Sequence, residues 1–365
     1  MRRGVVGRLG RMRSVGFAIA LVVALVVVSR AETPYPAGST SQTFDGMTVQ
    51  IHVPAGDQRF DGGFSLIVVL HGAGGTETGM AGSLRDFVPR GFLIVAPKSK
   101  GDTWQATDLD RVHRLVEHVC EAYGISPERR HAVGFSNGGW NLHPIALDEK
   151  LRFRTATWIA AGFKGGSVPK TARREMGCLA LAGEQDGNRA AAVGTIGALE
   201  KKVKWVDCRL EPNLGHAFPT TLVPYLGYFM EVFEGRFEPG HDLSYAWKDD
   251  LAAARETMAT EKRGGFVYVW SKDADEKERE LTRELQHDVF FDRTVRFFAD
   301  QLIAVKLEKD AAAELIAEEK IRSVPAIVVF EPGGKRVDKI LEGKLAAGKL
   351  AGALRGVARE KRPPK

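Results

Sequence analysis

Short, uniformly apolar runs alternate with amphipathic stretches between about residues 44 and 237. The apolar runs cover residues 64–70, 91–96, 130–134, 155–160, 178–182 and 204–210. Strands that are apolar on both faces are typical of parallel sheets with helices on each side. One intervening stretch has the spacing of an amphipathic helix, with apolar residues at Val112, Leu115, Val116, Val119, Cys120 and Tyr123. The alternation predicts an α/β fold with a doubly wound, mostly parallel sheet.

The composition changes after residues 238–242, which have the character of a domain boundary. Charged helices dominate beyond this point, and no cysteine follows Cys208. The pattern predicts helices at 251–260 and 275–285, and strands at 265–270, 302–307 and 326–330. A length of 365 residues also favours two domains over one. We therefore expect a first domain at 32–243, a smaller α/β domain at 244–348 and a basic C-terminal tail at 349–365.

The N-terminal region has the composition of an export signal. Residues 1–31 contain six arginines and no acidic residue, and residues 15–28 form an uncharged apolar run. Such a run is shorter than the roughly 20 residues of a typical membrane-spanning helix, but it suits a signal peptide. Small residues at Ser29 and Ala31 predict cleavage after Ala31, giving a periplasmic or secreted protein. The alternative is an uncleaved anchor that tethers the protein to the membrane.

The positive charge of the chain is concentrated at its two ends. The chain has 52 Lys and Arg against 46 Asp and Glu, a net charge of +6. Residues 1–31 contribute six of these positive charges, and residues 335–365 hold ten basic residues against three acidic ones. The residues between are net negative, so we expect no nucleic-acid partner.

Three cysteines are too few for a disulfide scaffold, and an odd number cannot all pair within the chain. Cys120 lies on the apolar face of the predicted helix and is expected to be a buried thiol. Cys178 and Cys208 lie on consecutive predicted strands. They either pair or remain buried thiols, and the geometry of parallel strands favours the second reading. No spacing of histidines and cysteines indicates a metal site, and no cofactor is expected.

The motif Gly134-Phe-Ser136-Asn137-Gly138 follows a predicted strand and precedes a helix-compatible stretch. This pattern is typical of a nucleophile elbow, in which a serine sits on a sharp turn and glycines avoid backbone collisions. A serine nucleophile also needs donors for its oxyanion. We expect these from the backbone N–H groups of Asn137 and of Ala73, which lies in a glycine-rich loop after an earlier strand.

The remaining partners of such a serine are expected in the order acid, then histidine. Asp186 directly follows one predicted strand and His216 follows the next, so Ser136, Asp186 and His216 form the candidate triad. Glu184 is the alternative acid. Taken singly, Asp186 fits a turn residue, His216 a surface histidine and Ser136 a helix N-cap.

With these motifs in place, residues 44–237 resemble the α/β-hydrolase fold. The closest resemblance is to carboxylesterases such as feruloyl esterases, polyhydroxybutyrate depolymerases and the phospholipase/carboxylesterase group, through residues 125–139, 183–186 and 215–216. The resemblance implies hydrolysis of a small-molecule or polymer ester through a Ser136 acyl-enzyme. His216 would act as base and then acid, and Asp186 would orient it. A serine peptidase of the same fold and a non-catalytic binding or scaffold protein remain alternatives.

Three residues outside the candidate triad depart from or extend this pattern. Pro144 is expected to break or kink the helix that follows the elbow. His143 beside it is a second proton acceptor in principle, with a packing role favoured. Trp104 either lines the substrate pocket or is a partly packed loop residue.

Residues from about 249 to 343 resemble the thioredoxin-like fold, through the strand at 265–270, the segment 289–292 and Ser323-Val-Pro325. The resemblance implies a cis proline at Pro325. The redox Cys-x-x-Cys is expected just after Trp270, but residues 271–277 contain no cysteine. Without a thiol, this domain cannot carry out thiol–disulfide exchange. A structural role or a peptide or protein contact near Pro325 remains.

Overall fold

The computed structural model describes residues 35–56, 63–163, 172, 175–203, 205–236 and 242–360, all of which belong to one compact unit. The predicted signal peptide at residues 1–31 lies outside the described residues. In the described part of the chain, no helix combines the length and the apolar character that crossing a membrane requires.

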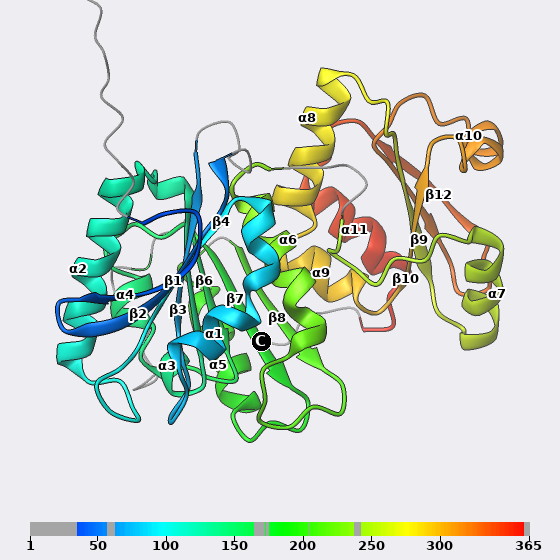
Figure 1. Ribbon diagram of the computed structural model, residues 1–365. Helices are drawn as coiled ribbons and strands as arrows, with labels where there is room; N and C mark the ends of the chain where they lie inside the picture. Colours follow the sequence, from blue (N-terminus) through cyan, green and yellow to red (C-terminus); the bar gives the residue numbers. More distant parts are fainter. Residues whose placement is uncertain are drawn as a thin grey trace, which may run out of the picture. The chain divides into compact units, whose positions relative to one another are not determined.

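The first half of the chain builds an eight-stranded sheet in the order β1-β2-β4-β3-β5-β6-β7-β8 (Figure 1). The strands β1 and β2 join the sheet antiparallel, and the pairs from β4 onward are parallel. This confirms the predicted mostly parallel sheet. The strands are β1 (Gly38–Phe44), β2 (Met47–Val53), β3 (Ser65–Leu70), β4 (Phe92–Pro97), β5 (Arg130–Phe135), β6 (Thr155–Ile159), β7 (Gly177–Gly183) and β8 (Trp205–Glu211).

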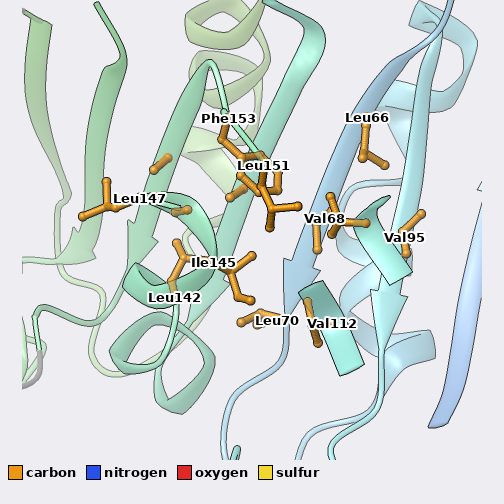
Figure 2. Close-up of a cluster of buried hydrophobic side chains, with 14 of the residues drawn as sticks. Leu66, Val68, Leu70, Val95, Val112, Leu142, Ile145, Leu147, Leu151 and Phe153 are labelled. Carbon is orange, nitrogen blue, oxygen red and sulfur yellow. The ribbon is translucent and has the colours of Figure 1, made fainter. Parts of the chain in front are cut away.

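Successive side chains of the central strands enter two different cores. On β3, Leu66, Val68 and Leu70 belong to one buried cluster, whereas Ile67 and Val69 belong to the other. This alternation follows from the two-residue period of a strand, and it explains why the strands read as uniformly apolar. Figure 2 shows the first cluster, in which side chains of β3 lie with Val112 and Ile145 from two covering helices.

Helices cover both faces of this sheet. The first cluster is closed by α2 (Ala106–Tyr123), α4 (His143–Ala146) and α5 (Arg189–Leu199). The second is closed by α1 (Glu77–Ser83), the 3₁₀ helix η2 (Arg85–Arg90) and α6 (Val223–Phe233). The shorter elements are η3 (Pro127–Arg129), α3 (Asn137–Trp140) and η4 (Thr220–Leu222). The sheet is therefore doubly wound, as predicted.

A four-stranded sheet follows, in the order β10-β9-β11-β12. Its strands are β9 (Gly265–Trp270), β10 (Ile303–Glu308), β11 (Ala326–Phe330) and β12 (Arg336–Glu342). Its helices are α7 (Leu251–Glu261), α8 (Glu276–Glu284), the π-helix η5 (Leu285–Val289), α9 (Arg293–Ala299), α10 (Ala313–Glu319) and α11 (Ala347–Val357). Residues of η5, α9 and α11 pack in one cluster with this sheet, and residues of α7 and α10 pack in the other. The peptide bond before Pro325 is cis, as the resemblance implied.

The later residues also contact the first sheet directly. The guanidinium of Arg296 on α9 lies 2.9 Å from the carboxylate of Asp207 on β8. The hydroxyl of Tyr228 on α6 lies 3.4 Å from the amide oxygen of Gln286 on η5. Phe291 belongs to the second core cluster of the eight-stranded sheet. The domain division near residue 243 stays a prediction, but these contacts make the two sheets parts of one packed structure.

The C-terminal prediction needs a correction. Residues 349–365 were expected to form a basic tail, but residues up to Val357 lie in α11. Its apolar side chains, including Leu350 and Leu354, are buried in the cluster that also contains residues of η5 and α9. The basic residues of this segment suggest a solvated tail, whereas the four-residue spacing of Leu350 and Leu354 is that of one face of a helix.

All three cysteines are free thiols, so Cys178 and Cys208 do not pair. Burial raises the pKa of the Cys120 thiol to about 11. Burial and the neighbouring Asp207 carboxylate raise the pKa of the Cys208 thiol to about 12. Both groups are therefore protonated and poorly nucleophilic near neutral pH.

Candidate active site

Ser136 lies on a sharp turn between β5 and α3. Its backbone has φ 48° and ψ −117°, a conformation that L-residues rarely adopt. The turn is fixed from one side, because the Ser136 N–H donates to the carbonyl of Ile159 on the neighbouring strand, at 2.8 Å. Such strain is maintained only where the surrounding structure holds it, and it is a feature of functional turns.

The glycines around Ser136 are required by close backbone contacts. A Cβ at Gly134 would lie 2.7 Å from the carbonyl oxygen of Gly138. A Cβ at Gly138 would lie 2.3 Å from the carbonyl oxygen of Leu70, at the end of β3. Both distances are below what any real side chain shows. The G-x-S-x-G spacing therefore brings α3 against the end of β3.

The structure brings the three candidate triad side chains together. The hydroxyl oxygen of Ser136 lies 2.9 Å from Nε2 of His216. Nδ1 of His216 lies 3.0 and 3.1 Å from the two carboxylate oxygens of Asp186. A carboxylate can only accept here, so Nδ1 carries the proton and Nε2 is free to accept from Ser136. The side chain of Asp186 is fully buried, whereas that of His216 is 45% exposed.

Asp186 is held in the loop that follows β7. Its carboxylate also accepts a hydrogen bond of 2.7 Å from the backbone N–H of Asn188. The amide of Asn188 in turn donates to the carbonyl of Ala160, after β6, at 2.9 Å. The alternative acid, Glu184, is exposed, and the structure does not bring its carboxylate to His216. Asn188 is a supporting residue that sequence reasoning missed, because its contact crosses to another strand.

One aromatic ring stacks on the imidazole of His216, and a second ring packs against the first. The ring of Phe135, which precedes Ser136, stacks on His216 with centroids 5.7 Å apart and an interplanar angle of 22°. Phe218 contacts Phe135 edge-on at 5.8 Å. These contacts restrict the orientation of the imidazole next to the serine. Neither ring was assigned a role from sequence, although both flank the two motifs that were.

The candidate oxyanion donors lie beside the serine. Gly72 approaches closely, since a Cβ there would lie 3.2 Å from Cβ of Ser136. Ala73 is the next residue, and Asn137 is the first residue of α3. In the described part of the chain, neither backbone N–H of these two residues donates to a protein acceptor. Both are thus available to a substrate oxygen.

The helix after the elbow is interrupted, as Pro144 predicted: α3 ends at Trp140 and α4 begins at His143. The ring of His143 contacts Phe163 edge-on at 6.0 Å, and Ser136 is hydrogen-bonded to His216 instead. Trp104 is 3% exposed, so the alternative of a partly packed loop residue is wrong, whereas a place in the wall of the substrate pocket stays a prediction. The burial could not be predicted, because a loop position does not reveal the tertiary partners of its side chain.

Acid should destabilise the loop that carries Ala73. His71 is fully buried, and burial lowers the pKa of its imidazole below the usual 6.5. Below about pH 6.5 the unfolded chain therefore binds more protons than the folded one, and the free energy of unfolding falls as the pH decreases. We expect urea denaturation to show a lower free energy of unfolding at pH 5.5 than at pH 7.5. His71→Asn, whose amide can still donate to the Gly72 carbonyl, should reduce this difference; an unchanged difference would exclude His71 as its source.

Among the described residues, no group of three or more His, Cys, Asp or Glu side chains is arranged to hold a metal ion. The arrangement around Ser136 instead combines a nucleophile, a base that contacts it and a buried carboxylate that orients the base. This geometry can generate a serine alkoxide and hold an acyl intermediate without an added group.

Comparisons with known proteins find similarity only among solved structures. No protein family and no curated protein matches the sequence. A feruloyl esterase module from Clostridium thermocellum is similar over 53% of this chain and 87% of its own, with 15% identity and a TM-score of 0.43. Est1E from Butyrivibrio proteoclasticus is similar over 55% of this chain and 100% of its own, with 13% identity and a TM-score of 0.44. A puromycin-hydrolyzing peptidase from Mycobacterium tuberculosis is similar over 54% of this chain and 39% of its own, with 16% identity and a TM-score of 0.45.

Proposed function

We propose that the protein is a serine hydrolase of the α/β-hydrolase fold that acts on ester bonds. The proposal is carried by one observation: Ser136, His216 and Asp186 form a continuous hydrogen-bonded chain with distances of 2.9 and 3.0 Å. The serine is on a strained turn and the carboxylate is buried. A surface histidine or a plain helix cap would require neither feature.

The reaction would follow from the position of each group. His216 takes the proton of Ser136 as the hydroxyl oxygen attacks the acyl carbon. The N–H groups of Ala73 and Asn137 stabilise the oxyanion of the tetrahedral intermediate. When this intermediate collapses, the alcohol leaves with the proton from His216 and the acyl group stays on Ser136. Water, activated by the same imidazole, then releases the acid and regenerates the serine.

A fluorophosphonate probe tests this proposal, because it forms a covalent bond only with an activated serine. The wild-type protein is expected to be labelled and Ser136→Ala is not. The wild type is also expected to hydrolyse short p-nitrophenyl esters faster than peptide p-nitroanilides. Faster anilide cleavage would instead indicate a serine peptidase, and absence of both labelling and turnover would indicate a binding or scaffold protein.

We further propose that residues 244–348, together with the rest of α11, form a thioredoxin-like domain without redox activity. The supporting features are the four-stranded sheet, the cis peptide bond before Pro325 and the lack of cysteine after Trp270. Its role would be structural, or a peptide or protein contact near Pro325. We also propose that residues 1–31 direct export, as the arginines and the apolar run of this segment suggest.

A further inference from the structure

The loop of residues 99–104, between β4 and α2, contacts both segments that carry the proposed oxyanion donors. Its last residue, Trp104, is 3% exposed and belongs to the first core cluster. The loop is anchored to α2 by the buried Asp108 carboxylate, which accepts hydrogen bonds from the backbone N–H groups of Lys100, at 3.4 Å, and Gln105, at 3.2 Å. The backbone on both sides of Trp104 is therefore held against the first turn of α2.

The indole of Trp104 is bonded to the first donor segment. Its Nε1–H donates to the carbonyl of His71 at 2.8 Å, and the centroids of the Trp104 and His71 rings lie 4.8 Å apart. His71 lies two residues before Ala73. The same segment contacts the loop at two further residue pairs: the Gly74 N–H donates to the carbonyl of Asp102 at 2.8 Å, and the Ser99 N–H donates to His71 Nε2 at 3.1 Å.

The backbone of Trp104 is bonded to the second donor segment. Its N–H donates to the side-chain oxygen of Asn137 at 3.0 Å. Asn137 is the residue whose own backbone N–H is the other proposed donor. Trp104 thus donates one hydrogen bond to each of the two segments that carry the proposed oxyanion donors.

We propose that Trp104 is a positioning residue that sets the separation of the Ala73 and Asn137 N–H groups, an inference that rests on the proposed esterase function. An oxyanion hole works because its donors are fixed before the charge develops. A small displacement of either donor weakens transition-state stabilisation, and it leaves substrate binding largely unchanged.

Trp104→Phe tests the inference, because it removes the indole N–H and keeps an aromatic ring. Each variant is assayed with p-nitrophenyl butyrate and with the matching thionoester, whose sulfur is a poor hydrogen-bond acceptor. We expect kcat/KM for the oxygen ester to fall by about 10–100-fold, mainly through kcat, and that for the thionoester to fall far less. Asn137→Ala, which removes the other contact and keeps the backbone N–H, should act in the same direction.

Trp158→Phe is the matched control. Trp158 is likewise buried in the first cluster, but its indole N–H has no hydrogen-bond partner among the described residues. Its replacement should lower stability to a similar degree and keep the ratio of ester to thionoester turnover. Equal loss on both substrates in Trp104→Phe, or the same ratio change in Trp158→Phe, would overturn the inference while leaving an active esterase. A wild type without esterase activity would overturn the proposed function and this inference with it.

Discussion

Replacing Asp186 by asparagine is expected to lower kcat for ester hydrolysis by about 10⁴-fold and to change KM little. The carboxylate of Asp186 accepts from Nδ1 of His216 and so leaves Nε2 free to accept from Ser136. An asparagine can turn its NH₂ group toward Nδ1, which favours the opposite tautomer. That tautomer carries its proton on Nε2 and cannot take the proton of the serine. Steady-state kinetics on p-nitrophenyl butyrate measure the effect.

Glu184→Gln is the control for Asp186→Asn. Its carboxylate lies two residues earlier in the same loop but is exposed, and we expect kcat to stay within about twofold of the wild type. If Glu184→Gln lost activity and Asp186→Asn did not, the acid would have been assigned to the wrong residue.

The second large effect is expected at Gly183, the last residue of β7. A Cβ at this position would lie 2.0 Å from the carbonyl oxygen of Leu214 and 2.6 Å from that of Gly215. These atoms belong to the backbone directly before His216, so an alanine must displace the loop that holds the base. We expect Gly183→Ala to lower the free energy of unfolding by about 1–3 kcal/mol. We also expect it to lower kcat by about 100-fold.

Gly187→Ala separates this clash from the general effect of adding a methyl group. Gly187 follows Asp186, and a Cβ there would meet no atom within 4 Å. Urea denaturation and ester turnover should therefore be close to wild-type values. Wild-type turnover in Gly183→Ala would show that the position of His216 does not depend on this contact.

The central strands could be predicted from sequence because both faces of the sheet are buried, which makes each strand a continuous apolar run. The edge strands β1 and β12 could not. The residues of β1 are polar and largely exposed, and β12 mixes charged with apolar residues, so neither has that signature. The helix α3 is only four residues long and has no period to detect.

The candidate site shows the same division. Ser136, Asp186 and His216 could be proposed because chain order and the positions of strand ends restrict where such residues occur. The stacking of Phe135 on His216 and the hydrogen bonds of Trp104 depend on side-chain directions between distant segments. The local sequence pattern does not specify the directions of these side chains.

The three free thiols bear on how the protein can be prepared and stored. With no disulfide to form, the chain should reach its native state in a reducing cytosol as readily as in an oxidising medium. Because Cys120 and Cys208 stay protonated near neutral pH, mixed disulfides with glutathione should form slowly at both. Recombinant material can then be purified with or without reducing agent, and the packed cores alone must maintain the fold in either case.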